Sequence, residues 1–172
     1  MTDEAETLYE GRHLRLKRRR GWEYAEHRTA SEAVLVMALT EDGRVVLVEE
    51  FRPAVNAPVV SPPAGLVGDE GPEEPAEAAR RELAEETGYE ADSFEPLGRG
   101  PGSAGQSSET VIFYLARGAR RTGEQAPHDR GVLRVHEVPI AEMSRFASER
   151  EAAGALVDPK VWAGLYLARL KR

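Results

Sequence analysis

The chain has 172 residues, of which 41% are hydrophobic and 31% are charged, and its net charge is −7. A chain of this length is expected to form one domain with a proper hydrophobic core. The negative charge argues against a general nucleic-acid binder, and the absence of cysteine excludes disulfides and thiol chemistry. We see neither a signal peptide nor an apolar run long enough to span a bilayer, so we expect a cytoplasmic protein without a membrane partner.

The N-terminal region predicts antiparallel strands. The first dozen residues, Met1–Arg12, are acidic and weakly patterned, and we expect residues 1–7 to be disordered. The segments His13–Lys17 and Trp22–Glu26 alternate like strands. The basic run Lys17–Arg20 between them could bind phosphate or RNA, but a solvated hairpin turn explains it more readily.

Apolar segments further along predict the centre of a sheet. The nearly all-apolar segment Ala33–Leu39 predicts a buried strand, and Val45–Val48 is its expected partner after a turn at Glu41–Arg44. We expect the chain to leave the sheet at Phe51–Pro53 and to form a rigid turn at Pro62–Gly65.

The second half of the chain predicts further strands and two helices. Gly98–Ser108 is rich in glycine and serine and predicts a long loop, a kind of segment that is often functional. Strands are predicted at Thr110–Ala116 and Val132–Val138, a loop at Arg117–Gly131, and helices at Ile140–Ser148 and Pro159–Leu170. Strands with inserted helices indicate a mixed α+β domain.

The acidic segment Glu73–Tyr89 predicts one more helix. Pro75 suits the first turn, and Gly88 supplies a C-terminal stop. Ala79 and Leu83 belong to one apolar seam along this helix.

Three carboxylates, Glu82, Glu85 and Glu86, share one patch of this helix because they lie at positions i, i+3 and i+4. Like charges four residues apart cost a helix roughly 0.2–0.5 kcal/mol unless a positive group lies between them. Arg81 can screen Glu85, so one interpretation is a solvated helix with ion pairs. The other is a divalent-cation site, because Mg²⁺ binds carboxylate and phosphate oxygens.

The spacing of this segment resembles the Nudix box, G-x5-E-x7-R-E-U-x-E-E-x-G-U, in which U is a bulky apolar residue. Every fixed position from Glu73 to Tyr89 matches. Gly65 is the expected opening glycine, but seven residues separate it from Glu73 instead of five, which indicates a two-residue insertion before the helix.

The resemblance implies an α+β fold, the Nudix α/β/α sandwich around a mixed sheet, with an N-terminal antiparallel β extension. Residues 1–172 would form a single Nudix hydrolase domain. Within it, residues 1–30 would supply strands for dimerisation and residues 31–172 the catalytic core.

Segments outside the box resemble the ADP-ribose pyrophosphatase branch and its relatives that act on sugar nucleotides. These segments are Trp22–Tyr24, Val48–Pro53, Pro63–Gly65 and Leu165–Ala168. The branch forms homodimers by exchanging N-terminal strands, and its tryptophan, glutamate and arginine contact the base and the phosphates. Those substrate-binding roles fall on Trp22, Glu23 and Arg52. Trp22 could equally be a core or dimer residue, and Arg52 a surface ion pair.

Two loops depart from the pattern of the branch. Members specific for ADP-ribose carry Ser-Pro-Gly after the box, followed by a glutamate, whereas this chain has Ser103, Ala104 and Gly105 before Glu109. Ser103 and Gly105 are therefore further substrate-binding candidates. A later loop of the branch carries clustered acids, but here it holds a single one, Asp129, which leaves the general base open between Glu85, Asp129 and Glu109.

The implied activity is Mg²⁺-dependent hydrolysis of a nucleoside diphosphate linked to a sugar, such as ADP-ribose, with Mn²⁺ as a possible substitute. The products would be a nucleoside monophosphate and a sugar phosphate. The implied metal ligands are Glu82, Glu85, Glu86 and the Ala64 carbonyl, with Arg81 holding the glutamates in register. A housecleaning pyrophosphatase for nucleoside triphosphates and a non-catalytic nucleotide-binding regulator are the alternatives. We expect Glu86 to face solvent.

Overall fold

A computed structural model describes residues 4–68, 71–126 and 133–171. The strands are β1 (Glu6–Glu10), β2 (Leu14–Arg19), β3 (Trp22–His27), β4 (Glu32–Leu39), β5 (Arg44–Arg52), β6 (Ala57–Ser61), β7 (Ala64–Leu66), β8 (Tyr89–Glu90), β9 (Ser93–Pro101), β10 (Thr110–Arg117), β11 (Arg120–Arg121), β12 (Arg134–Pro139) and β13 (Leu156–Val157). The helices are α1 (Pro75–Thr87), a 3-10 turn at Ile140–Glu142, α2 (Met143–Ala152) and α3 (Pro159–Leu170). No helix in these ranges is long and apolar enough to cross a membrane.

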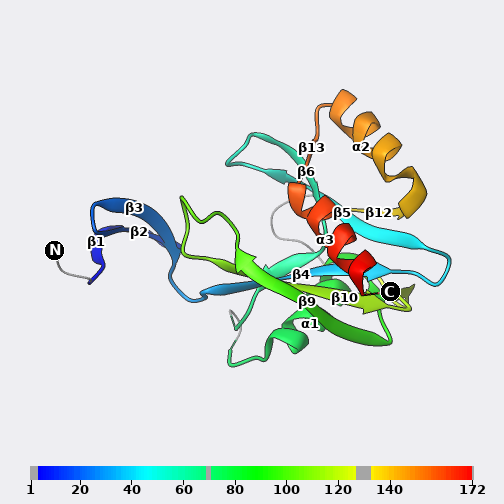
Figure 1. Cartoon of the computed structure of the whole chain (residues 1–172), viewed down its shortest axis with the longest axis horizontal. Helices are drawn as coiled ribbons and strands as arrows, with labels where there is room; N and C mark the ends of the chain where they lie inside the picture. The colour runs from blue at the N-terminus through cyan, green and yellow to red at the C-terminus, as the bar shows by residue number, and fades with distance from the viewer. Residues whose placement is uncertain (1–3, 69–70, 127–132, 172) are drawn as a thin grey trace.

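A mixed eight-stranded sheet forms the body of the molecule (Figure 1). Its order is β13-β6-β5-β4-β10-β9, with β12 also paired to β5 and β7 paired to β4. The pairs β4–β10 and β6–β13 are parallel, and the others are antiparallel. Helix α1 packs on one face, and α2 and α3 pack on the other. The α+β sandwich that the resemblance implied is confirmed.

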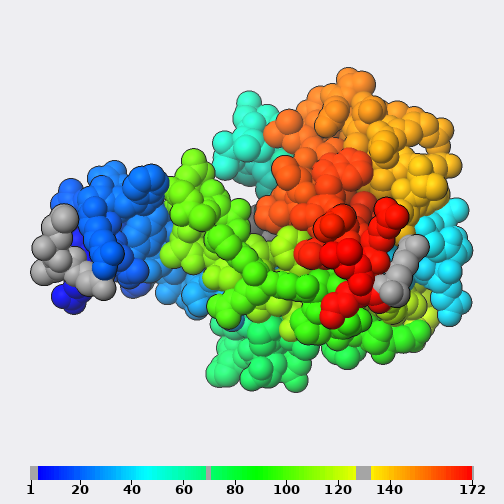
Figure 2. Space-filling view, viewed as in Figure 1, coloured from blue at the N-terminus to red at the C-terminus, as the bar shows by residue number. Residues whose placement is uncertain are grey.

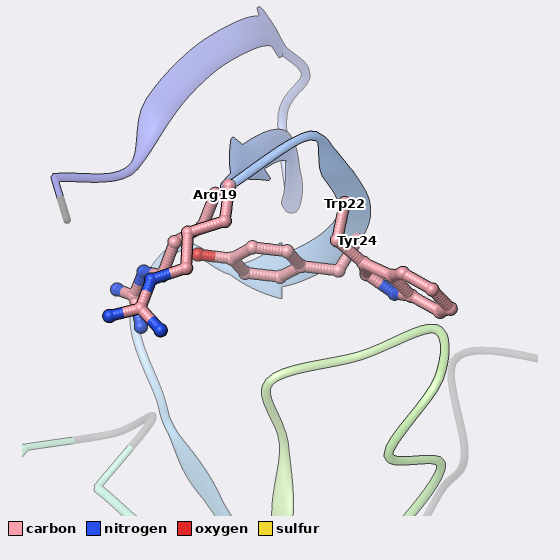
Figure 3. Close-up of a pocket in the computed structure, with 4 residues that line it drawn as sticks. Arg19, Trp22 and Tyr24 are labelled. Carbon is pink, nitrogen blue, oxygen red and sulfur yellow. The ribbon is translucent and has the colours of Figure 1, made fainter. Parts of the chain in front are cut away.

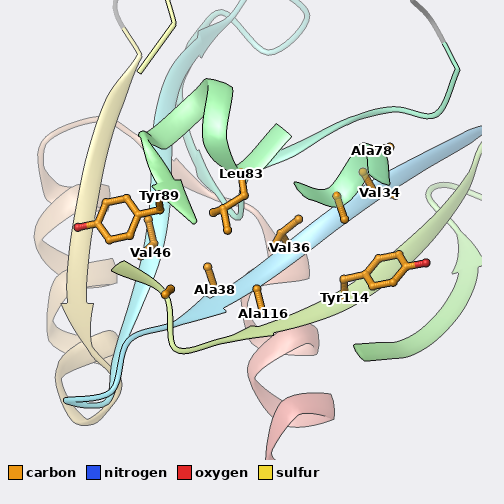
Figure 4. Close-up of a cluster of buried hydrophobic side chains, with 11 residues drawn as sticks. Val34, Val36, Ala38, Val46, Ala78, Leu83, Tyr89, Tyr114 and Ala116 are labelled. Atoms are coloured by element: carbon orange, nitrogen blue, oxygen red, sulfur yellow. The ribbon is translucent and has the colours of Figure 1, made fainter. Parts of the chain in front are cut away.

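Alternation along β4 builds a core on each face of the sheet. Val34, Val36 and Ala38 are fully buried and pack with α1 through Leu83 (Figure 4). The intervening Met37 points to the other face, where α3 approaches so closely that a side chain at Gly164 would meet its sulfur. Each fully buried aliphatic side chain of this kind contributes about 1.5–3 kcal/mol, so α1 is held on the sheet by its apolar side.

Strands β1, β2 and β3 form a separate antiparallel sheet that projects to one side of the body (Figures 1 and 2). This N-terminal extension touches the loop before β10. There, the Ala25 amide donates to the Gln106 carbonyl at 2.8 Å, and the Ser108 amide donates to the Ala25 carbonyl at 3.0 Å. The hairpin expected around the basic run is present, with its turn at Arg20–Gly21.

Five predictions about element boundaries are wrong. The turn expected at Pro62–Gly65 is shorter, because residues 64 and 65 belong to β7, which pairs with β4. The loop expected at Arg117–Gly131 contains strand β11, which pairs with β8. Residues 6 and 7 belong to strand β1, where disorder was expected, because β1 pairs with β2 and Glu6 is neutralised by Arg18. Residues 51 and 52 remain in β5, since the unpredicted strand β6 pairs with them. Residues 98–101 lie in β9 because they pair with β10, so the loop is shorter than expected. In each case the deciding partner is another strand.

Candidate active site

Local sequence sets the two ends of α1. Pro75 occupies the first turn, and Glu74 and Glu77 form a reciprocal capping box. Gly88 closes the helix with φ of 73°, a left-handed conformation that glycine adopts at little cost. Start, stop and apolar seam therefore agree with the sequence prediction.

Arg81 lies at the centre of the hydrogen-bond network on the polar face of α1. Its guanidinium binds Glu73 through two hydrogen bonds of 3.0 and 3.1 Å. It also donates to Glu82 at 2.7 Å, to Glu85 at 3.2 Å and to the Leu66 carbonyl at 3.2 Å. The hydrogen bonds from Arg81 hold the pKa of Glu73 below its usual range. One arginine thus fixes three glutamates relative to strand β7.

Glu82 and Glu86 are buried, with exposed fractions of 8% and 9%. The expectation that Glu86 faces solvent is wrong, because this side of α1 packs on β7 and the Ala64 amide donates to the Glu86 carboxylate at 3.1 Å. Burial raises the pKa of Glu86 to about 8, although the Ala64 hydrogen bond opposes the shift; the charges of Glu82 and Glu50 add to it. At neutral pH this carboxyl therefore holds a proton unless a cation takes its place.

Gly65 leaves room for the Glu82 carboxylate. A Cβ atom at this position would lie 1.8 Å from Glu82 Oε1 and 2.0 Å from its carboxyl carbon. A side chain at this position would therefore displace the Glu82 carboxylate. This is a physical reason for the glycine that the motif places before the helix.

Strand β5 adds a carboxylate that was not among the predicted site residues. Glu50 is 4% exposed, and its carboxylate forms an ion pair of 3.0 Å with Arg52, the candidate phosphate-binding arginine. Glu50 and Arg52 act electrostatically on Glu86 in opposite directions. The sequence signal that could have identified Glu50 is an acidic residue inside an otherwise apolar strand, because a buried charge needs a partner or a ligand.

The donor set on this face fits a hard divalent cation. All of the candidate side-chain ligands are carboxylates, which such ions prefer, and Gly65 keeps space beside Glu82. Within the described ranges, no three His, Asp or Glu side chains are already arranged as a metal site. Arg81 instead holds Glu82 and Glu85, so a cation would compete with this guanidinium for them.

Trp22 and the loop before β10 form a second group, on the extension (Figure 3). The indole N–H of Trp22 donates to the Gly105 carbonyl at 3.1 Å, while 63% of the side chain remains exposed. The Ser103 carbonyl accepts from the amides of Gln106 and Ser107 and shapes this loop. Trp22, Ser103 and Gly105 therefore lie together, apart from the carboxylates of α1.

The three candidates for the general base lie in different places. Glu85 is exposed, unlike Glu82 and Glu86, and accepts a hydrogen bond from Arg81. Glu109 is half-buried just before β10. Asp129 lies outside the described residues. Glu23 is exposed on β3, on the face opposite Trp22.

Comparison with known proteins gives a consistent result. The sequence model of the NUDIX domain matches residues 29–158. A methanol dehydrogenase activator of Bacillus methanolicus is 37% identical over 97 residues, which cover 56% of this chain and 51% of that protein. An ADP-ribose pyrophosphatase of Mycobacterium tuberculosis (strain ATCC 25618 / H37Rv) is 33% identical over 134 residues, which cover 77% of this chain and 62% of that protein. The chain thus spans between about half and two thirds of the length of these curated relatives.

A solved structure of an ADP compounds hydrolase superposes with a TM-score of 0.73 and 22% identity. The match covers 96% of this chain and 90% of that chain. At this identity the likeness shows a shared fold.

Proposed function

Because the chain belongs to the NUDIX domain family, we propose that it hydrolyses the pyrophosphate bond of a nucleoside diphosphate linked to a sugar. ADP-ribose and related sugar nucleotides are the proposed substrates, in agreement with the name of the mycobacterial relative. Nudix hydrolases generally use a divalent metal ion, and we propose Mg²⁺, with Mn²⁺ able to substitute.

The observation that carries this proposal is the surplus of acid around Glu86. Glu82, Glu86 and Glu50 are all buried, and together they raise the cost of ionising Glu86. A divalent cation relieves this repulsion, whereas an apolar ligand does not. The proposed ligands are Glu82, Glu85, Glu86 and the Ala64 carbonyl.

In the proposed reaction, the oxygen of water bonds to one phosphorus and the bridging P–O bond breaks. The bridging oxygen leaves with the other phosphate, which gives a nucleoside monophosphate and a sugar phosphate. A bound divalent ion neutralises the diphosphate and lowers the pKa of coordinated water. Arg81 keeps the glutamates in register, and Arg52 places positive charge beside the phosphates. The base takes one proton from water, and Glu85, Glu109 and Asp129 are the candidates.

The proposal includes a homodimer built through the N-terminal extension. Tyr9, Leu14 and Leu16 are exposed and lie on one face of its sheet, because Tyr9 pairs across from Leu16 and Leu14 is two residues away. Apolar side chains gathered on one sheet face favour burial against another protein surface. Light scattering at the exit of a sizing column would show twice the mass of the chain; a monomer at micromolar concentration would exclude this assembly.

A substrate panel tests the activity. ADP-ribose, GDP-mannose and a deoxynucleoside triphosphate are each incubated with the protein and Mg²⁺, and the products are identified by mass. We expect a nucleoside monophosphate and a sugar phosphate from at least one sugar nucleotide. Pyrophosphate release from the triphosphate alone would favour the housecleaning reaction. Tight binding with no hydrolysis of any compound would favour a regulator.

A further inference from the structure

The basic run at the tip of the extension has no role in the proposed hydrolysis. Arg19 and Arg20 line a hollow of about 530 Å³ together with Trp22 and Tyr24 (Figure 3). Arg19 lies directly across from Trp22 in the register of β2 and β3, on the same sheet face. Figure 3 shows the Tyr24 ring lying between them, with its hydroxyl toward the arginine side. Two aromatic rings and two guanidinium groups therefore share one surface.

The turn that carries Arg20 is conformationally costly. Arg20 and Gly21 have φ angles of 52° and 83°, as a two-residue mirror-image hairpin turn requires. Asn-Gly is the favoured pair in such a turn, because a long L side chain is strained at positive φ. A strained residue at an exposed tip is a reason to look for a function.

Arg19 is available to an anionic ligand. It is exposed and makes no ion pair with the described residues, whereas its neighbour Arg18 points to the opposite face and pairs with Glu6 at 2.8 Å. Guanidinium groups bind phosphate with paired hydrogen bonds. The net charge of the protein is −7, so the positively charged patch at Arg19 and Arg20 has the opposite sign to the molecule as a whole.

Trp22 offers a fixed ring beside these cations. Its N–H is held by the Gly105 carbonyl, which orients the indole while leaving most of it exposed. An exposed, oriented aromatic ring stacks on nucleobases, with little dependence on which base is present. The hollow therefore combines a stacking ring with phosphate donors.

We propose that this hollow binds a nucleotide that carries a second phosphate on its ribose, with the base on Trp22 and that phosphate on Arg19 and Arg20. This inference rests on the proposed function in one respect. In the proposed hydrolysis the diphosphate binds at the α1 carboxylates, so the arginines beside Trp22 are left to bind another phosphate. The preferred substrates would then be sugar nucleotides phosphorylated on the nucleoside ribose.

Calorimetric titration of the full chain without divalent cation tests this assignment. The probes are AMP, ADP, adenosine 2′,5′-bisphosphate and adenosine 3′,5′-bisphosphate. We expect one of the two bisphosphates to bind at least about tenfold more tightly than both AMP and ADP at low salt, and this difference to shrink as salt screens the contact. The two isomers show which ribose hydroxyl carries the phosphate.

Two variants and one control test whether the preference for the bisphosphate depends on the arginines at the hairpin tip. Arg20→Asn keeps a residue suited to the turn and removes the guanidinium, and Arg19→Ala removes the other. Each is expected to remove most of the preference for the bisphosphate. Arg18→Ala has the same change in charge on the opposite face and is expected to leave the preference intact. In a Trp162→Phe background Trp22 is the one remaining tryptophan of two, so quenching of its fluorescence by the bisphosphate reports stacking.

Three results would overturn the proposal. These are equal binding of AMP and both bisphosphates, ADP binding as tightly as the better bisphosphate, and an unchanged preference in both arginine variants. The readout needs no cation and no turnover. Failure to hydrolyse any sugar nucleotide would therefore leave the calorimetric difference standing, and loss of the difference would leave the proposed hydrolysis untouched.

Discussion

Glu49 and Glu50 are neighbours on β5 and are both almost fully buried, but they point to opposite faces of the sheet. On the α2 face, Glu49 is surrounded by basic side chains: His136 Nε2 lies 3.0 Å away, the Arg150 guanidinium 3.6 Å and the Arg134 guanidinium 3.8 Å. A carboxylate in such surroundings is neutralised by the protein itself.

On the α1 face, one guanidinium serves several carboxylates. Arg81 forms ion pairs with Glu73, Glu82 and Glu85, and Arg52 forms one with Glu50. Burial raises the pKa of Glu86, and the charges of Glu82 and Glu50 add to this shift. Burial of acid is thus a feature of both faces, whereas the sharing of one guanidinium by three carboxylates is a feature of the α1 face. The α1 face is where an added cation would stabilise the protein.

The largest effect is expected from Glu86→Gln. The amide oxygen can still accept from the Ala64 amide, so the fold should persist, but a proposed metal ligand is lost. Because metal-ion stabilisation of transition-state charge is worth several kcal/mol, we expect kcat to fall by roughly 10³-fold. Steady-state hydrolysis of the best sugar nucleotide measures this, with thermal unfolding as the control for folding. Near-normal turnover would remove Glu86 from the metal site.

The second effect tests the space beside Glu82. Gly65→Ala places a methyl group where the Glu82 carboxylate lies, so this carboxylate must move. We expect kcat/KM to fall by about 10²-fold, as misplacement of catalytic groups by about 1 Å does. Gly98→Ala is the matched control, because its added methyl group meets no atom within 4 Å. Equal activity of the two variants would show that the position of Glu82 is unimportant.

Arg81→Lys should have a smaller effect. Lysine keeps the charge but cannot reproduce the fork that binds Glu73, Glu82 and the Leu66 carbonyl together. Loss of such an orienting partner costs about 10–100-fold in activity or metal affinity. The neighbour Arg80 lies over the Phe94 ring instead, 4.5 Å from its centre. Arg80→Lys should therefore retain activity, and a similar loss in both variants would count against an orienting role for Arg81.

The smallest effect on activity is expected on the other face. Glu49→Gln removes a charge from a cluster that holds β12 and α2 against β5. We expect it to lower the free energy of unfolding by about 1–3 kcal/mol, with kcat within about threefold of wild type, as for a site remote from the chemistry. Chemical denaturation and steady-state kinetics measure the two quantities. A large loss of kcat without a loss of stability would mean that the two faces do not differ as described.

Much of the site could be predicted from the sequence because the motif lies on one helix. The spacing of Glu82, Glu85 and Glu86, the start at Pro75 and the stop at Gly88 follow from local rules. Burial of Glu86 could not be predicted, since it depends on how β7 packs against α1. The role of Glu50 was missed for the same reason: it meets Glu86 only after β5 and α1, distant in sequence, are folded together.

The elements of the fold likewise divide into those that local sequence predicts and those that depend on a partner strand. Strand β4 and helix α3 were predicted because their own apolar patterns define them. Strands β1 and β6 and the first half of the Gly98–Ser108 segment were not, because each depends on a partner strand for its hydrogen bonds. The two groups of site candidates, on α1 and around Trp22, could be assigned from motifs, but their separation in the chain's own fold could not.

The pKa of Glu86 also sets the dependence of stability on pH. Its folded value of about 8 lies above the ordinary value of 4.5, so between these values the folded state holds a proton that the unfolded state has released. Without a cation, stability is therefore greatest below about pH 4.5 as far as this group is concerned, and it is lost as pH rises towards 8, by an amount on the order of several kcal/mol. A cation that replaces the proton removes this loss.

Calorimetric titration of Mg²⁺ into the full chain at pH 7, in two buffers with different ionisation enthalpies, therefore tests the central claim directly. Since the Glu86 carboxyl holds its proton at this pH and a ligand must be deprotonated, binding should release about one proton in the wild type and close to none in Glu86→Gln. Binding that releases no proton, or the same release in both proteins, would contradict a cation site on the α1 face.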